Sequence, residues 1–268
     1  MKSESVKQTI WLRTPISYYG GKQQMLKHIL PRIPEHKTYV EPFFGGGAVF
    51  WAKKQADIEI INDNNAHVIN FYKQLKHHFD ELKHLIDATL HSRDSYKEAL
   101  VIYHAPYLFS ELKRAWAFWI TTNMGYSKMI GSWGYDNAGK AERSIMNRKI
   151  ELTTEYATRL ERVQIECNDA IKVIQSRDMP DAFLYCDPPY VGADQGHYGG
   201  YTQEHFDHLL YGLSQAKGKF LLSSYPNSTL QEYVEACNWH QMDVNMHLSA
   251  SSKAGSKKTE ILTANYPI

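Results

Sequence analysis

Short runs of apolar residues alternate with amphipathic stretches along most of this chain. Residues 37–54 and 56–79 each have the pattern of a strand, a polar or glycine-rich turn and then a helix. Residues 162–175 repeat this pattern, and further strands are predicted in 181–190 and 219–225. Strands that alternate with helices indicate an α/β fold, in which helices cover both faces of a mostly parallel sheet.

The C-terminal segment departs from this pattern. Apolar and polar residues alternate in 239–250 and again in 259–268, as they do in an antiparallel pair that closes a sheet. We therefore predict an antiparallel last strand. Apolar residues at helical spacing also predict two helices. One is opened by Lys22 and carries Met25, Leu26, Ile29 and Leu30, and the other carries Val68, Phe71, Tyr72, Leu75, Phe79 and Leu82.

No buried-strand pattern occurs from about residue 78 to residue 158. This stretch contains helical segments and then, in 121–144, glycines that separate aromatic and basic residues, as loops or a hairpin require. We predict that 78–158 forms an inserted subdomain, mainly helical with a hairpin, within a catalytic domain made of 10–77 and 159–268.

Composition is that of a folded soluble protein. The chain has 268 residues, 43% of them hydrophobic and 22% charged, enough for one domain with a large insertion. No apolar run reaches the length of a membrane span, and the first nine residues form no secretory signal. The three cysteines lie far apart and the thirteen histidines lack metal-ligand spacing. We therefore expect reduced thiols, no bound metal and a cytoplasmic location.

Positive charge is concentrated in two places, although the net charge of the chain is only +1. Between residues 107 and 150, seven lysines and arginines face three acidic residues. Three more lysines, Lys253, Lys257 and Lys258, precede the last predicted strand. Such clusters fit either an ordinary solvated surface or contacts with nucleic acid.

Three features follow predicted strands and therefore meet at one sheet edge. Gly45, Gly46 and Gly47 separate a strand from a helix, where residues without Cβ let a ligand approach the backbone. Their spacing matches neither a dinucleotide fingerprint nor a P-loop. Asp63 and Asp169 end the next two strands, and open α/β sheets bind ligands at this edge. The alternative for Asp63 is a cap on the following helix.

The strand in 181–190 runs directly into Asp187, Pro188, Pro189 and Tyr190. A carboxylate and a backbone carbonyl that both accept from an aromatic amine draw its nitrogen out of conjugation and stabilise the charge that develops on methylation. The prolines fix the direction of that carbonyl, because they lock the backbone. Tyr190 offers a flat face to an unstacked base, and an amine within a duplex must be flipped out to reach it.

An ordered set of motifs now resembles a known family over nearly the whole chain. The set is YYGGK (18–22), YVEPFFGGGAVF (39–50), INDNN (61–65), DPPY (187–190), SSYPNS (223–228) and TEILTANY (259–266). It is similar to that of the Dam-type, D12-class DNA adenine-N6 methyltransferases of the α group. In that group the target-recognition region lies between the glycine loop and DPPY. The resemblance implies a Rossmann-like methyltransferase sheet and transfer from S-adenosylmethionine to N6 of a flipped-out adenine in double-stranded DNA.

The resemblance also implies roles for individual residues. Asp187, Pro188, Pro189 and Tyr190 would be catalytic. S-adenosylmethionine would be held by Tyr18, Gly20, Gly21, Lys22, Glu41, Pro42, Phe43, Gly45, Gly46, Gly47, Asp63, Asn64, Asp169, Ala170 and Asp187. DNA would contact Lys128, Lys140, Arg143, Arg148, Lys149, Lys253, Lys257 and Lys258. The implied partners are double-stranded DNA and, in a restriction–modification pair, a cognate restriction endonuclease.

Alternatives remain at this point. DPPY also occurs in enzymes that methylate cytosine N4, an RNA adenine or a protein glutamine amide, and a silent DNA-binding protein could keep the same fold. The sequence departs from GATC methylases at Tyr18, where tryptophan is common, and it has MGYSKMIGSWGYD in place of an FNVPFG-like hairpin. The resemblance therefore implies adenine methylation and does not extend to GATC as the recognition site.

Overall fold

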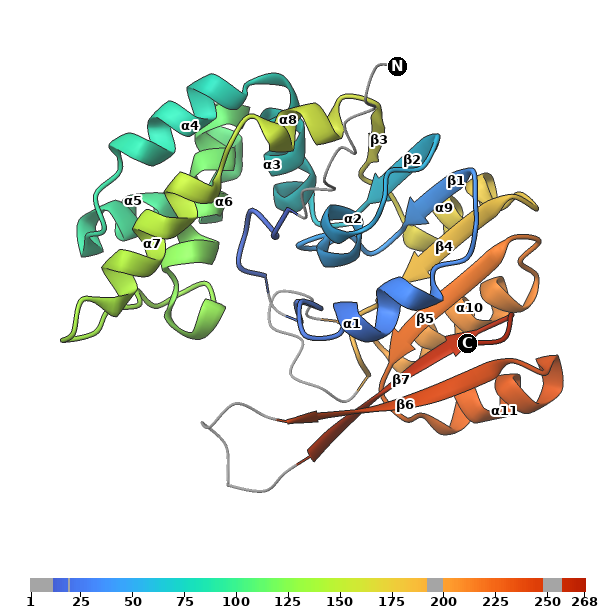
Figure 1. Cartoon of the computed structure of the whole chain (residues 1–268). Coiled ribbons are helices and arrows are strands. Elements are labelled where there is room, and N and C mark those ends of the chain that lie inside the picture. The colour runs from blue at the N-terminus through green and yellow to red at the C-terminus, as the bar shows by residue number, and fades with distance from the viewer. Residues whose placement is uncertain (1–11, 19, 192–199, 248–256) are drawn as a thin grey trace, which may run out of the picture.

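A seven-stranded sheet forms the centre of the molecule (Figure 1). The structure is a computed structural model that describes residues 12–18, 20–191, 200–247 and 257–268. Within these residues the strand order is β3-β2-β1-β4-β5-β7-β6. The strands are β1 (Thr38–Glu41), β2 (Ile58–Asn62), β3 (Val163–Glu166), β4 (Ala182–Cys186), β5 (Lys219–Ser224), β6 (His240–His247) and β7 (Lys257–Ala264). Only β7 runs antiparallel, to both β5 and β6, which confirms the predicted mostly parallel sheet with an antiparallel last strand.

Helices cover both faces of the sheet. They are α1 (Leu26–Ile29), α2 (Ala48–Ala52), α3 (Ala66–His77), α4 (Phe79–Ala88), α5 (Arg93–His104), α6 (Glu111–Met124), α7 (Lys140–Glu151), α8 (Glu155–Leu160), α9 (Ala170–Arg177), α10 (Gln203–Ser214) and α11 (Ser228–Cys237). Short 3₁₀ helices are η1 (Leu30–Arg32), η2 (Pro106–Leu108) and η3 (Tyr126–Lys128). Because successive strand residues point to opposite faces, Phe183 joins one core with α3 and α6, and Leu184 joins another with α9 and α10.

Two predicted helices differ from the observed ones in extent. The apolar spacing from Val68 to Leu82 continues through His78, but the backbone breaks there, at φ −135° and ψ 42°, and divides the segment into α3 and α4. Both helices bury their apolar side on the same core, so the spacing carries no sign of the break. Lys22 does not open α1, because a turn closed by the Met25 amide and the Lys22 carbonyl precedes the helix.

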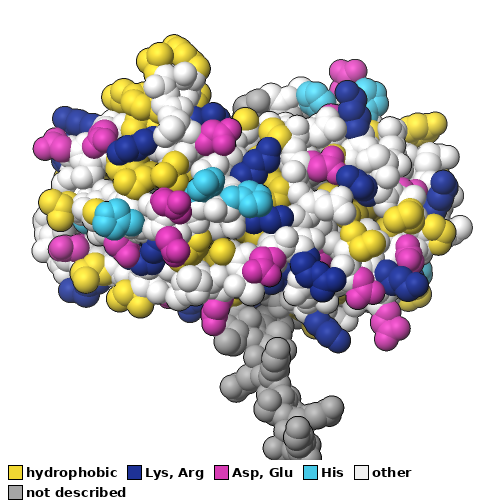
Figure 2. Space-filling model, turned by 90° about the horizontal axis from the view of Figure 1, so that it is seen from above, with side chains coloured by type: hydrophobic (Ala, Val, Ile, Leu, Met, Phe, Trp, Pro, Cys, Tyr) yellow, Lys and Arg dark blue, Asp and Glu magenta, His cyan; other side chains and the backbone are white. Residues whose placement is uncertain are grey.

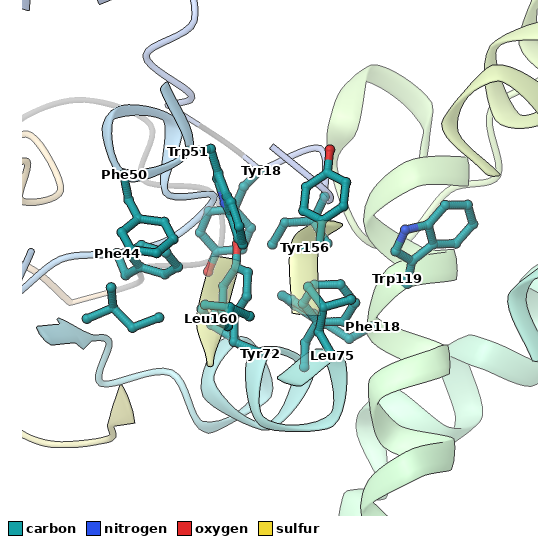
Figure 3. Packing of buried hydrophobic residues seen from close by; sticks show 14 of the residues in the cluster. Tyr18, Phe44, Phe50, Trp51, Tyr72, Leu75, Phe118, Trp119, Tyr156 and Leu160 are labelled. Carbon is teal, nitrogen blue, oxygen red and sulfur yellow. The ribbon is translucent and has the colours of Figure 1, made fainter. Parts of the chain in front are cut away.

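The segment between β2 and β3, which contains the predicted insertion, shares its hydrophobic core with one face of the sheet. Phe118 and Trp119 of α6 are fully buried in the same cluster as Tyr72 of α3 and Trp51 of α2 (Figure 3). On the return from the insertion, Tyr156 of α8 packs edge-on against Trp51, with ring centroids 5.1 Å apart. The insertion is therefore fixed to the sheet through apolar and aromatic packing.

A buried ion cluster fixes the same junction. The Glu59 carboxylate of β2 pairs with Lys53 at 2.5 Å and with the Arg159 guanidinium of α8. Lys53 lies over the Tyr39 ring, 4.1 Å from its centroid, and Arg159 lies over Phe50 at 3.9 Å. The two cations satisfy one buried carboxylate, which links α8 to the sheet where the chain re-enters it.

The strand register brings the glycine loop and DPPY together. β1 and β4 are parallel neighbours, with Val40 opposite Leu184. β1 ends at Glu41 and β4 ends at Cys186, so the loop after β1 and Asp187 after β4 lie at the same edge of the sheet. None of the helices in the described part of the chain is long and apolar enough to cross a membrane.

Candidate active site

A cavity of about 290 Å³ opens at the carboxyl ends of β1 and β4. Four stretches supply most of its wall: the N-terminal segment, the glycine turn before α1, the glycine loop and DPPY. The lining residues include Thr14, Ile16, Ser17, Tyr18, Gly20, Gly21, Lys22, Glu41, Phe43, Gly45, Gly46, Gly47, Arg148, Tyr185, Asp187, Pro188, Pro189, Tyr190, Tyr225 and Glu260. All four catalytic candidates therefore share one cavity with nine other predicted cofactor residues.

The glycine loop takes a conformation that needs glycine. Gly45 and Gly47 have φ values of +47° and +66°, in the left-handed region that side chains disfavour. A Cβ on Gly47 would lie 2.4 Å from the Phe44 ring. The loop therefore presents bare backbone to the cavity, and the helix after it, α2, is only five residues long.

Lys22, Asp187 and Tyr190 form a connected polar cluster in the cavity. The Lys22 ammonium is 3.0 Å from Asp187 Oδ1, and Tyr190 Oη donates to the same oxygen at 3.2 Å. Lys22 also donates to the Gly20 carbonyl and lies 4.8 Å from the centre of the Tyr190 ring. The Tyr190 hydroxyl is 3.0 Å from Ser223 Oγ, and its ring packs on Tyr225 at 4.2 Å.

This cluster fixes the orientation of the Asp187 carboxylate. Within the described part of the chain, both donors to Asp187 bind Oδ1. Oδ2 is therefore the oxygen that can accept a hydrogen bond from a ligand. Burial raises the pKa of Asp187, and Lys22 and the Tyr190 hydroxyl oppose that rise. Burial likewise lowers the pKa of Lys22, but the nearby Asp187, Glu260 and Tyr185 outweigh it and the net pKa is raised. Lys22 is therefore a permanent cation beside the carboxylate.

Glu41 is a second carboxyl group on the cavity wall. Tyr39 Oη donates to Glu41 Oε2 at 2.6 Å, and the Glu41 side chain is almost fully buried. Burial and, to a smaller extent, the charge of Asp187 raise the pKa of Glu41 against the Tyr39 hydrogen bond, and the net pKa is about 8. Glu41 therefore holds a proton near neutral pH when no cation lies beside it.

Glu41→Gln should change how stability depends on pH. A folded-state pKa near 8, against an ordinary value of 4.5, stabilises the fold at low pH, and this contribution is lost as the pH rises from about 4.5 to 8. Glutamine imitates the protonated acid, so the variant should gain stability over wild type by about 2–4 kcal/mol between pH 5 and 8. Urea unfolding across this range measures the difference.

Glu35→Gln is the matched control, because Glu35 is exposed. Its unfolding free energy should follow that of the wild type at every pH. Parallel curves for Glu41→Gln and wild type would show that Glu41 is ionised throughout, contrary to its burial.

Tyr185 reaches the same cavity from β4. Its side chain is 1% exposed, and its hydroxyl has no hydrogen-bond partner among the described residues. A buried unpaired hydroxyl is unfavourable, so its place on a cavity wall indicates a partner that comes with a ligand.

Some predicted cofactor residues lie outside this cavity wall. The buried Asp63 carboxylate accepts from the Gly45 amide at 2.8 Å and from the Asn65 amide at 2.9 Å, and so holds the glycine loop in place. Asp169 caps α9 by accepting from the Lys172 amide. The remaining three are Pro42, which is buried, Asn64, which is exposed, and Ala170, which begins α9. Their contact with a ligand stays a prediction.

The predicted DNA-binding residues fall into different settings. Lys140 and Arg143 are exposed on the first turns of α7. Arg148 and Lys149 instead bond within the protein, Arg148 to the Thr14 carbonyl and Lys149 to the carbonyls of Asp87 and Thr89. The backbones of Lys128, Lys257 and Lys258 lie in η3 and β7, and Lys253 lies outside the described residues. On the face seen in Figure 2, lysine and arginine side chains alternate with acidic ones.

Sequence reasoning missed several residues of the cavity wall. Tyr185 precedes Asp187 by two positions and so lies on the same face of β4, a signal that strand periodicity provides. Ser17 directly precedes the YYGGK motif, and Glu260 lies within TEILTANY. Neither residue was assigned a role of its own from the sequence. Arg148 was assigned to DNA from its charge alone, and charge does not reveal which carbonyl a guanidinium contacts.

Comparison with known proteins identifies the family. The model of the D12 class N6 adenine-specific DNA methyltransferases matches residues 18–248, and this chain belongs to that family. The match spans the glycine loop, the insertion and DPPY, so the sequence resemblance is confirmed. The protein is an adenine-specific DNA methyltransferase.

Named relatives agree with this assignment. The Type II methyltransferase M1.LlaDCHI of Lactococcus lactis subsp. cremoris is 28% identical over 97% of this chain and 98% of its own length. The DNA adenine methylase of Escherichia coli strain K12 is 22% identical over 95% of this chain and 96% of its own. The DNA N-6-adenine-methyltransferase of Escherichia phage P1 is 28% identical over 66% of this chain, but over only 24% of its own length.

Proposed function

We propose that this protein transfers a methyl group from S-adenosylmethionine to N6 of an adenine flipped out of double-stranded DNA. The observation that carries the proposal is the single cavity shared by the glycine loop and the Lys22–Asp187–Tyr190 cluster. A methyltransferase needs a donor site and an acceptor site in contact, and these two features meet there.

The cavity fits the chemistry of the proposed donor. Its bare glycine loop admits a close ligand, and the Tyr185 hydroxyl, which has no partner among the described residues, could bond to a polar group of that ligand. Asp187 and Glu260 supply negative charge to a ligand that carries a sulfonium and an ammonium, and Glu41 would lose its proton when such a cation lies beside it. Lys22 supplies a cation for the carboxylate of the ligand. The residues that would hold the donor are Tyr18, Lys22, Glu41, Tyr185 and the loop Gly45–Gly47. S-adenosylmethionine would supply an activated methyl group at this site.

The DPPY residues would prepare the acceptor amine. Asp187 Oδ2 and the Pro188 carbonyl would accept hydrogen bonds from N6, which frees the lone pair and stabilises positive charge at the nitrogen. Lys22 and Tyr190 hold Oδ1, so the carboxylate needs no reordering at each turnover. An adenine within a duplex cannot reach this cavity, which supports base flipping. The Tyr190 ring, fixed by Ser223 and Tyr225, would provide the stacking surface.

DNA would be held mainly by the insertion. Exposed cations such as Lys140 and Arg143 suit phosphate contacts, which position a duplex without reading its sequence. The Type II name of the Lactococcus relative supports a role beside a cognate restriction endonuclease for this chain as well. DNA that the enzyme has methylated should then resist cleavage by that endonuclease.

Labelled S-adenosylmethionine tests the proposed reaction. The full chain is incubated with the methyl-labelled donor and one acceptor at a time. The acceptors are duplex DNA, RNA and protein extract. We expect label in duplex DNA, recovered as N6-methyladenine after digestion to nucleosides. Label in N4-methylcytosine, in RNA or in protein would select one of the rival acceptors, and unlabelled DNA would contradict the proposal.

A further inference from the structure

The N-terminal side of the cavity is formed by a segment outside the helices and strands. Within residues 14–18, which we call the N-terminal wall, Thr14, Ile16, Ser17 and Tyr18 line the cavity. This wall has no sheet or helix ladder of its own to fix it. Its apolar side chains Ile16 and Tyr18 are buried in the core, but its backbone polar groups and Ser17 need hydrogen-bond partners from other segments.

Two inserted helices supply those side chains. Asn123 of α6 accepts through Oδ1 from the Ser17 amide at 3.2 Å and from Ser17 Oγ at 3.1 Å. Arg148 of α7 donates from Nη1 to the Thr14 carbonyl at 2.8 Å and from Nη2 to Ser17 Oγ at 2.9 Å. The Ser17 hydroxyl thus accepts from Arg148 and donates to Asn123, which is the full use of one donor hydrogen and one acceptor.

The setting of Arg148 differs from that of a phosphate-binding arginine. Both terminal nitrogens of its guanidinium bond to the wall, and the side chain is half-buried at the cavity. Arg143, one turn and a residue earlier on α7, is exposed, and the one hydrogen bond of its side chain in the described part of the chain is to the Ala138 carbonyl. The same helix therefore presents one cation to solvent and uses another inside the protein.

We propose that Arg148 and Asn123 are positioning residues for the methyl donor, so that the inserted segment completes the donor cavity by holding the N-terminal wall. This inference rests on the proposed function, because it concerns affinity for S-adenosylmethionine. Under this inference Arg148 does not make the DNA phosphate contact that the sequence predicts, but holds the N-terminal wall of the donor cavity in place. Hydrogen bonds from a charged donor are among the stronger ones, so their loss should release the wall.

Calorimetric titration of the full chain with S-adenosylmethionine, in the absence of DNA, tests the inference. Arg148→Ala should raise the Kd about tenfold or more. Ser17→Ala, a small change that leaves the fold intact, should raise it in the same direction. In the double variant Arg148→Ala, Ser17→Ala the Kd should rise by less than the product of the two single increases, because both substitutions remove the same hydrogen bond between Arg148 and Ser17. Lys97→Ala, which removes an exposed cation from the insertion, is the matched control and should bind as the wild type does.

Salt dependence of DNA affinity separates this role from a phosphate contact. Arg148→Ala should keep the wild-type slope of log K against log salt, whereas Arg143→Ala should reduce it by about 0.9 if it contacts a phosphate. A wild-type Kd for S-adenosylmethionine in Arg148→Ala and Ser17→Ala, or a slope reduced by about 0.9 in Arg148→Ala, would overturn the inference. A wild-type protein that binds no S-adenosylmethionine would instead overturn the proposed function, and this inference with it.

Discussion

Asp187→Ala should lower the single-turnover rate of methyl transfer to DNA by about 10²-fold or more at saturating donor. The carboxylate is the group that would accept from the target amine and face the charge that develops there. Alanine leaves the Pro188 carbonyl in place but removes the only ionised acceptor that the DPPY turn offers. Rapid-quench measurement with labelled donor gives this rate apart from product release.

Loss of activity in this variant needs a control for folding. Asp187→Ala leaves the buried Lys22 cation without its carboxylate partner, which costs about 3–5 kcal/mol of stability. The double variant Lys22→Met, Asp187→Ala removes both charges, so its thermal midpoint should recover while its activity stays lost. A transfer rate within tenfold of wild type in either variant would contradict the role of Asp187.

Lys22→Met should shift the pH dependence of transfer. Activity requires ionised Asp187 and so falls as the pH drops through the pKa of that carboxyl. Lys22 opposes the rise that burial imposes on this pKa, so its removal raises the pKa further. We expect kcat at pH 7 to fall by about tenfold or more, and the acid limb of the kcat profile to move to higher pH.

The measurement is kcat against pH from 6 to 10 in both proteins. Lys27→Met, which removes an exposed lysine of α1, should keep the wild-type profile. If Lys22→Met raised KM for the donor and left the pH profile of kcat unchanged, Lys22 would serve the donor alone. That result would remove it from the positioning of Asp187.

The sheet and the central residues of the site were predictable because they follow from local patterns. Strand, turn and helix repeat with regular spacing, and the carboxyl ends of parallel neighbours must share an edge. The glycine loop and Asp187 therefore meet wherever β1 and β4 pair. The antiparallel β7 was predictable as well, because alternating apolar and polar residues are typical of a strand with one covered face.

Contacts between distant segments were not predictable in the same way. The sequence places Lys22 near a glycine turn and Asp187 after a strand, but the ion pair between them depends on how that turn packs. Asp63 stands at a strand end as expected, and only the fold shows that its carboxylate binds the backbone of the glycine loop. Arg148 carries the same charge as Arg143, and only the fold shows that Arg148 bonds to the Thr14 carbonyl while Arg143 is exposed.

The most direct test of the central claim is a crystal structure of the protein with S-adenosylhomocysteine, the demethylated form of the proposed donor. We predict that the ligand occupies the cavity between the glycine loop and DPPY, with its sulfur facing the Asp187 carboxylate and a polar group bonded to the Tyr185 hydroxyl. Ligand bound elsewhere on the chain, or bound in this cavity with its sulfur directed away from Asp187, would contradict it.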